Sequence, residues 1–200
     1  MKAFLRRRHG AWRRFTFGQW VYLAHVAGLI LPGEELPQHR AHVVDAQPLD
    51  GWGDEDVTAM IDEGRRQFDR QLSDLEQIRG RAQWLFTVGA GITTVLAGAL
   101  ATGHSHGGRL ALWITGLTLL VLGVAGAAAV MTTRADFRAI DTAVLSRYVP
   151  PVLPALARDY ARMLRIGENT VATRLTIFRQ AVVYAILGGY LGLLASLLGR

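Results

Sequence analysis

The chain has 200 residues and a mass of 21.9 kDa; 50% of its residues are hydrophobic and 19% are charged. Cysteine is absent, which excludes disulfides, thiolate nucleophiles and cysteine-ligated metal sites. The apolar content excludes a disordered chain, and the net charge of +6 comes from 22 basic residues, 21 of them arginine, against 16 acidic ones.

The first 31 residues combine a basic start with a short apolar stretch over residues 20–31. The pattern is like that of a signal peptide, but no small-x-small cleavage site follows the apolar stretch. We predict that residues 1–31 form a basic amphipathic segment in the membrane interface, with Trp20 and Tyr22 in the headgroup zone and arginines on anionic lipid. The arginines are Arg6, Arg7, Arg8, Arg13 and Arg14. Two alternatives stay open: a fourth, short transmembrane span, and a helix packed on the protein's own soluble part.

Residues 32–53 contain three prolines and three glycines, so we expect a linker with little regular structure. A cytoplasmic stalk helix is predicted over residues 54–83, where three acidic residues at the start suit the positive end of a helix dipole. Since no helix breaker follows, we predict one continuous helix from about residue 55 to residue 102.

A heptad-like seam runs along this stalk. Its positions recur every three or four residues at Ile61, Gly64, Phe68, Gln71, Leu75, Ile78, Ala82 and Leu85. The seam packs either on residues 135–175 of the same chain or on another chain in a coiled coil.

Three stretches without a charged residue are long enough to cross a bilayer. They cover residues 84–102, 110–131 and 181–199. A bilayer core about 30 Å thick needs about 20 apolar residues in a helix. We place the entry of the third span near Arg179, so that it covers 179–199, and expect Trp84 and Arg179 at the interface. The predicted fold class is an all-α membrane protein with three transmembrane helices and long cytoplasmic helical extensions.

The distribution of arginine predicts the topology. Residues 1–83 carry 12 Lys and Arg and residues 132–175 carry seven, whereas the loop 103–109 carries one. Under the positive-inside rule, the N-terminus and residues 132–175 are cytoplasmic, and the loop and the C-terminus face outward. We therefore predict a multi-pass membrane protein with a cytoplasmic N-terminus.

Residues 132–178 are predicted to form a cytoplasmic helical hairpin. The second span is expected to continue past Met131 and to stop before Pro150 and Pro151, because proline lacks an amide donor and restricts the residue before it. Pro154 suits the first turn of the next helix.

Small residues in the spans predict close helix packing, because they allow two backbones to approach. The candidates are Gly98, Gly123, Ala127, Ala185, Gly188, Gly189, Gly192 and Ser196. The spacing does not distinguish packing within one subunit from packing between subunits, so a homo-oligomer remains one of two interpretations.

The chain has no P-loop, zinc-protease or nucleophile-elbow motif. No span has an acidic or basic residue in its interior, which argues against a proton relay or ion pathway. His39 with His42, and His104 with His106, lie on loops without a third ligand. We predict no enzymatic activity, no cofactor and no metal. The charge pattern suits a membrane surface rather than nucleic acid, which we exclude as a partner.

Two predicted helices begin polar and become apolar, in the stretches FDRQLSDLEQIRGRAQWLF and ENTVATRLTIFRQAVVYAILGGYLG. In this respect residues 55–199 resemble, in architecture, the multi-span membrane effectors of nucleotide-signalled anti-phage defence in bacteria. The resemblance implies a protein that oligomerises on a signal and compromises the inner membrane. The first functional hypothesis is thus an oligomerising membrane effector or small pore-forming protein. The alternative is a non-catalytic membrane anchor or assembly subunit, whose cytoplasmic helices dock a partner protein.

Overall fold

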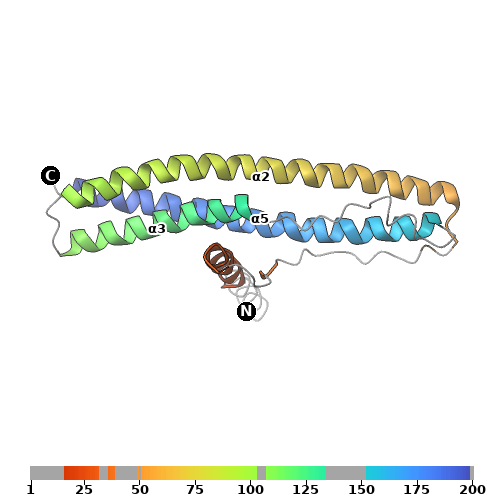
Figure 1. The fold of residues 1–200 in the computed structure, drawn as a ribbon, viewed down its shortest axis with the longest axis horizontal. Helices are drawn as coiled ribbons and strands as arrows, with labels where there is room; N and C mark the ends of the chain where they lie inside the picture. The colour runs from red at the N-terminus through yellow and green to blue at the C-terminus, as the bar shows by residue number, and fades with distance from the viewer. Residues whose placement is uncertain are drawn as a thin grey trace, which may run out of the picture. The chain divides into compact units, whose positions relative to one another are not determined.

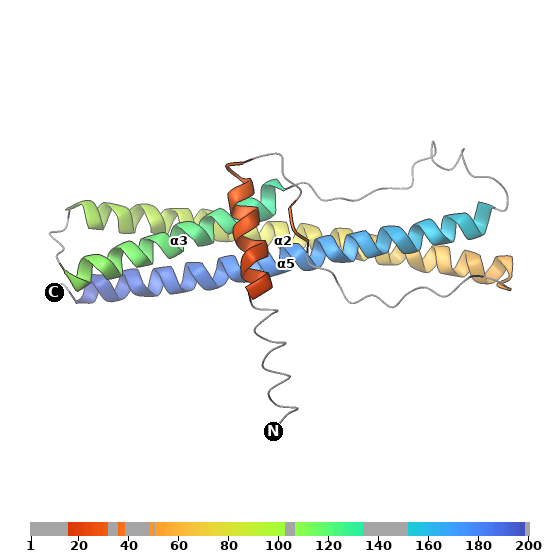
Figure 2. The ribbon, with the colours of Figure 1, turned by 90° about the horizontal axis from the view of Figure 1, so that it is seen from below.

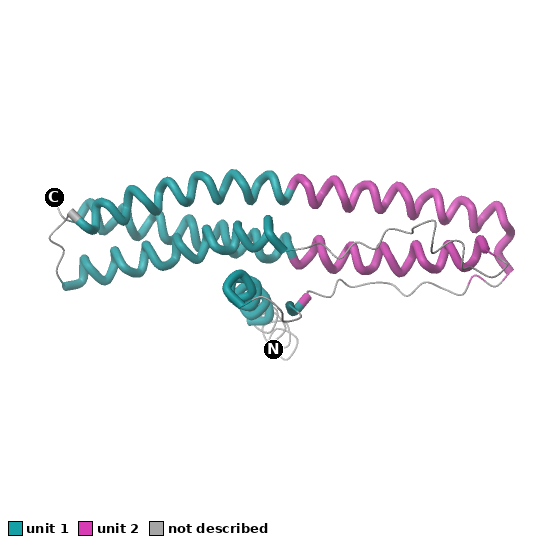
Figure 3. Tube along the Cα trace, in the orientation of Figure 1, with its two compact units in different colours: residues 1–37, 78–133, 174–200 teal, residues 38–77, 134–173 magenta. Residues whose placement is uncertain are grey.

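The computed structural model describes residues 16–31, 36–38, 49, 51–102, 107–133 and 152–198. The described part is all-helical, as predicted, with four helices and no strand (Figure 1). The first helix covers residues 16–28, and three longer ones follow: α2 (Asp54–Thr102), α3 (Gly108–Thr132) and α5 (Val152–Leu197). The chain divides into two compact units, drawn in Figure 3. Unit 1 contains residues 1–37, 78–133 and 174–200, and unit 2 contains residues 38–77 and 134–173.

Helix α2 is one uninterrupted helix of 49 residues, which confirms the prediction that the stalk continues into the first span. Asp54, Glu55 and Asp56 occupy its first turn, where carboxylates interact favourably with the exposed amide ends of the helix. No proline lies between these acids and Thr102. The polar stretch and the apolar stretch therefore form one element.

Helix α3 ends earlier than predicted. Thr133 has extended backbone angles (φ −65°, ψ 132°), so the helix ends at Thr132, one residue after Met131. It was predicted to continue from there as the first arm of the hairpin. The carbonyl oxygens at this end bind the side chain of Arg174, which replaces the next turn of helix as their partner. The first arm of the predicted hairpin, over residues 134–151, lies outside the described residues, as does most of the linker.

Helix α5 begins at Val152 and has Pro154 in its first turn, as predicted. It continues without a break for 46 residues to Leu197, so the second arm of the predicted hairpin and the third span are one helix.

Three helices, α2, α3 and α5, are long and apolar enough to cross a membrane, and they contain the three stretches that the sequence predicted as spans. They differ in how much protein covers them. Within the most apolar window of each helix, 39% of the residues are buried in α3, 22% in α5 and only 6% in α2. Helix α3 is therefore the best-covered span, and α2 presents most of its apolar surface to its surroundings.

Unit 2 pairs the first parts of α2 and α5. Val57, Ile61 and Ala157 form its buried core, and Leu153 and Tyr160 pack against them. Gly64 faces Tyr160 closely, since a methyl group at Gly64 would lie 3.3 Å from the Tyr160 Cβ atom. The predicted seam thus packs within its own chain in this unit, which favours the first of the two alternatives that the sequence left open.

Candidate functional site

Helices α3 and α5 run antiparallel in unit 1 and meet along a seam with a regular period (Figure 2). Four contacts recur at steps of seven residues on both helices: Arg109 with Ala195, Gly116 with Gly188, Gly123 with Ala181, and Val130 with Arg174. A seven-residue period keeps two helices in contact if they coil gently around each other. Small residues occupy the middle of this seam and arginines occupy its two ends.

The backbones are close enough in the middle of the seam that no side chain fits between them. A methyl group at Gly188 would lie 2.5 Å from the Leu120 nitrogen and 2.6 Å from the Gly116 oxygen. A methyl group at Gly123 would lie 2.8 Å from the Ala181 oxygen. Close backbone approach of this kind is a main source of helix association in lipid, where the hydrophobic effect gives no preference for one helix over another.

Each helix has its C-terminal carbonyl groups bound by an arginine of the other. Arg174 is 3% exposed, and its guanidinium donates to the Val130 oxygen at 2.8 Å and to the Thr133 oxygen at the end of α3. At the opposite end, Arg109 Nε donates to the Ala195 oxygen at 3.0 Å. The negative end of a helix dipole favours a cation, and a buried guanidinium needs such acceptors. The two arginines therefore fix the register of the pair.

The helix over residues 16–28 crosses α3 and α5 (Figure 2). Val21 and Tyr22 are fully buried; the Tyr22 hydroxyl donates to the Leu122 oxygen, and its ring covers Gly126. Tyr22 therefore contacts protein rather than lipid headgroups, whereas the position of this helix in the membrane interface stays a prediction.

A polar network reinforces this docking. Gln19 Nε2 donates to Gln180 Oε1 at 2.9 Å, and the Tyr184 hydroxyl donates to Gln19 Oε1 at 2.6 Å. His25 is also buried, with Nδ1 2.8 Å from the Val21 oxygen. The polar side chains of this short helix thus find partners inside the protein.

The opposite face of the helix carries large apolar side chains that are exposed. Phe17, Trp20 and Leu23 are between 43% and 62% exposed. The helix belongs to unit 1, where it contacts the apolar stretches of α3 and α5 through Leu122 and Tyr184. These contacts do not favour the open alternative of packing on a soluble part.

The predicted packing residues divide into two groups. Gly123, Ala185, Gly188 and Gly192 lie at close helix contacts, and Ala127 is fully buried. Among the described residues, no atom lies within 4 Å of a methyl group placed at Gly98 or Gly189. The Ser196 hydroxyl donates to the Leu193 oxygen of its own helix at 2.7 Å.

Of the predicted interface residues, Trp20 and Trp84 are 62% and 69% exposed, and Arg179 is exposed as well. The five arginines before residue 15 lie outside the described residues.

Sequence reasoning missed Arg174 and Arg109 as structural residues. It treated these two arginines only as charges to be counted for topology. The signal was present, since Arg174, Ala181, Gly188 and Ala195 follow one another at intervals of seven.

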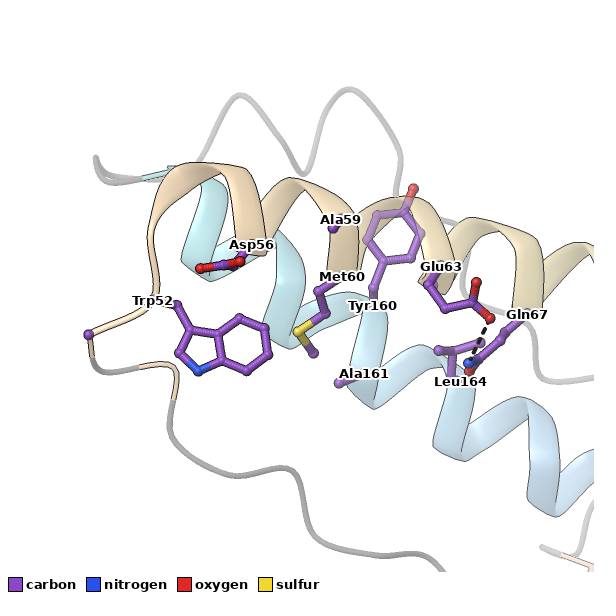
Figure 4. Close-up of a pocket in the computed structure, with 11 residues that line it drawn as sticks. Trp52, Asp56, Ala59, Met60, Glu63, Gln67, Tyr160, Ala161 and Leu164 are labelled. Atoms are coloured by element: carbon purple, nitrogen blue, oxygen red, sulfur yellow. Dashed lines mark hydrogen bonds between the residues drawn. The ribbon is translucent and has the colours of Figure 1, made fainter.

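A separate cavity of about 600 Å³ lies in unit 2 (Figure 4). Trp52, Met60, Tyr160 and Leu164 give it apolar and aromatic walls. Its acidic lining residues are Asp56 and Glu63, and none of the lysine, arginine or histidine residues that the structure describes lines it. Pockets of this size with apolar walls and a few polar groups are typical of binding sites.

The polar groups around this cavity are held by neighbours on α2. Gln67 Nε2 donates to Glu63 Oε1 at 3.3 Å, the bond drawn in Figure 4. Arg66 lies 3.8 Å from Glu63. Arg65 Nε donates to the Tyr160 hydroxyl at 3.4 Å, and this bond raises the pKa of Arg65. Within the described residues, no three histidine, aspartate or glutamate side chains gather as a metal site would require.

Comparison with protein-family models, with curated proteins and with solved structures gives no match.

Proposed function

We propose that this chain is a multi-pass membrane protein that anchors a partner protein to the membrane, with unit 2 as the docking surface. The observation that carries the proposal is the cavity lined by Trp52, Met60 and Tyr160. Trp52 is 47% exposed although it is large and apolar. Exposed aromatic side chains beside a pocket are typical of the anchor points of protein interfaces.

The internal use of the small residues supports an anchor. Gly188 and Gly123 lie at the contact between α3 and α5, and Gly64 contacts Tyr160. These three glycines could have served association between subunits, but each already packs against another helix of its own chain. The described residues of unit 2 leave the cavity open.

The partner that suits the cavity has an apolar side chain next to a basic one. The apolar side chain would contact Trp52 and Met60, and the basic group would lie near Asp56. Both kinds of contact are weak alone, and together they give a transient, specific interface.

The proposed setting is the bacterial inner membrane, with the N-terminus and unit 2 in the cytoplasm. The arginine distribution supports this orientation. The helix over residues 16–28 fits the inner interface, because its partner Gly126 precedes the end of α3 by six residues, or about 9 Å of helix. Interfacial helices lie about 5–10 Å deep with their apolar face toward the acyl chains, and Trp20 and Leu23 supply such a face.

Site-specific photo-crosslinking in cells tests the docking surface. A photoreactive amino acid at Met60 lies in the cavity, whereas one at Leu72, which is 38% exposed on the same helix, does not line it. An anchor predicts a heteromeric adduct from Met60 and none from Leu72. Equal adducts at both sites, or only adducts of twice the 21.9 kDa chain mass, would refute this assignment of the docking surface.

A second candidate is the oligomerising membrane effector, in keeping with the architectural resemblance stated above. The observation that favours it is a row of small residues on α2, where Gly91, Thr94 and Gly98 are exposed at intervals of three and four residues. Crosslinks at Gly98 and leakage of liposomes that contain the purified protein would support an effector. A monomeric mass in detergent without leakage would favour the anchor.

A further inference from the structure

A second groove, of about 350 Å³, lies in unit 1 between α2 and α5. Its walls are Leu85, Phe178, Val182 and Ile186, and Arg81 and Trp84 complete its lining at the N-terminal end of the α2 span. The accessible surface inside the groove is entirely apolar. From Phe178 to Ile186 the groove follows eight residues of α5, or about 12 Å of helix.

Among the described lining residues, Arg81 is the cation, and it lies at the end of the groove next to Trp84. Arg81 is exposed, and in the described part of the chain it makes no hydrogen bond or ion pair. Trp84, one turn further, is 69% exposed. Indole and guanidinium groups at this level are typical of the headgroup zone, where tryptophan sits between water and acyl chains and arginine meets phosphate.

We propose that this groove binds an anionic phospholipid, with one acyl chain along Leu85, Val182 and Ile186 and the headgroup phosphate on Arg81. The inference rests on the proposed membrane placement of α2 and α5, and it is independent of partner docking on unit 2. A lipid fits better than a protein helix, because the accessible surface of the groove is apolar and the one basic residue of its described lining, Arg81, lies at the end next to Trp84.

The charge of the lipid follows from the same geometry. A zwitterionic headgroup brings its own cation to the phosphate, whereas an anionic headgroup leaves the attraction to Arg81 uncompensated. Interfacial arginines contribute about 1 kcal/mol each to binding of anionic lipid, which corresponds to about a fivefold preference.

Native mass spectrometry of the full chain in detergent tests the proposal. The protein is incubated with equal amounts of phosphatidylglycerol and phosphatidylcholine that carry the same acyl chains. We expect wild-type protein to retain the anionic lipid about fivefold more than the zwitterionic one, and Arg81→Gln to retain the two equally. Arg79→Gln is the matched control, because Arg79 is also exposed on α2 but does not line the groove.

A second variant tests the acyl-chain half of the site. Val182→Phe fills the groove, so it should lower the retention of both lipids while the thermal unfolding temperature stays within a few degrees of wild type. The proposal is overturned if wild type shows no headgroup preference, if Arg79→Gln loses the preference as Arg81→Gln does, or if a second chain rather than lipid accompanies the protein. Crosslinking at Met60 reports on the docking proposal separately, so either proposal can fail alone.

Discussion

Gly188 is the position at which one added methyl group should do the most damage. Its Cβ would meet three backbone atoms of α3: the Leu120 nitrogen at 2.5 Å, the Gly116 oxygen at 2.6 Å and the Leu120 Cα at 3.0 Å. Backbone atoms in the middle of a helix cannot turn aside as the end of a side chain can. The change Gly188→Ala therefore forces the two helices apart.

The size of the effect follows from these distances. Ordinary contacts begin at about 3.5 Å, so α3 and α5 would have to separate by roughly 1 Å at this point. A gap of 0.5–1 Å loses about a quarter to a half of the dispersion energy of the neighbouring contacts. Overpacking in well-packed sites costs about 1–3 kcal/mol, and we place Gly188→Ala at the upper end, about 2–3 kcal/mol.

Unfolding in mixed detergent micelles, with increasing dodecyl sulfate and helix content as the signal, measures this loss. Gly189→Ala is the matched control, since no described atom lies within 4 Å of a methyl group there, and it should be neutral or slightly stabilising. Gly192→Ala should be intermediate. Its Cβ would meet the Leu96 Cδ1 atom at 2.7 Å, the end of a side chain that can rotate.

Equal behaviour of Gly188→Ala and Gly189→Ala would refute the close approach of α3 and α5. A different outcome, in which Gly188→Ala leaves the monomer stable but abolishes an oligomer, would show that the seam joins two chains. Leu193→Ile and Leu197→Ile should change little in either case, because both side chains are 57% exposed.

Three further outcomes are expected. Arg174→Met should lower stability by about 2–3 kcal/mol, since it leaves the carbonyl groups at the end of α3 without their charged donor; a stability equal to wild type would show that these carbonyls do not need it. Gly126→Ala should displace the Tyr22 ring, because the Tyr22 hydroxyl would lie 2.5 Å from the new methyl group. Amide hydrogen exchange should then become faster in residues 16–28 but not in α5. Unchanged exchange in residues 16–28 would contradict the docking of this helix on α3. In intact cells, an impermeant thiol reagent should label Gly108→Cys but label Asp69→Cys only after lysis, because the arginine distribution places these positions on opposite sides of the membrane. Labelling is specific because the chain has no cysteine of its own. The reverse pattern would invert the proposed topology.

Composition and periodicity alone determined the element types of this protein. Uninterrupted apolar length identifies a span, because the bilayer core sets a minimum that no other environment imposes. The polar and apolar parts of α2 form one continuous helix, because no proline interrupts the chain between Asp54 and Thr102. The heptad of Ile61, Leu75 and Ile78 identified a buried face, since only a face that contacts another helix must be apolar at that spacing.

Only the tertiary structure decided which surfaces those faces contact. Gly188 and Gly189 are equivalent by composition, yet one touches the backbone of α3 and the other touches no described atom within 4 Å. The reason is angular: adjacent residues on a helix point about 100° apart, so the position of a neighbouring helix selects between them. The same holds for Tyr22 and Trp20 on the first helix, where one ring is fully buried on α3 and the other is 62% exposed.

Two arginines of α5 show why the sequence alone does not predict burial. Arg174 and Arg179 are five residues apart on one helix and count equally in a charge balance. Arg174 is buried because the end of α3 offers it carbonyl oxygens, whereas Arg179 is exposed. A helix end is a strong site for a cation only where another helix brings one to it. That meeting depends on the antiparallel register of α3 and α5, which is a property of the packed pair and is absent from either segment read alone.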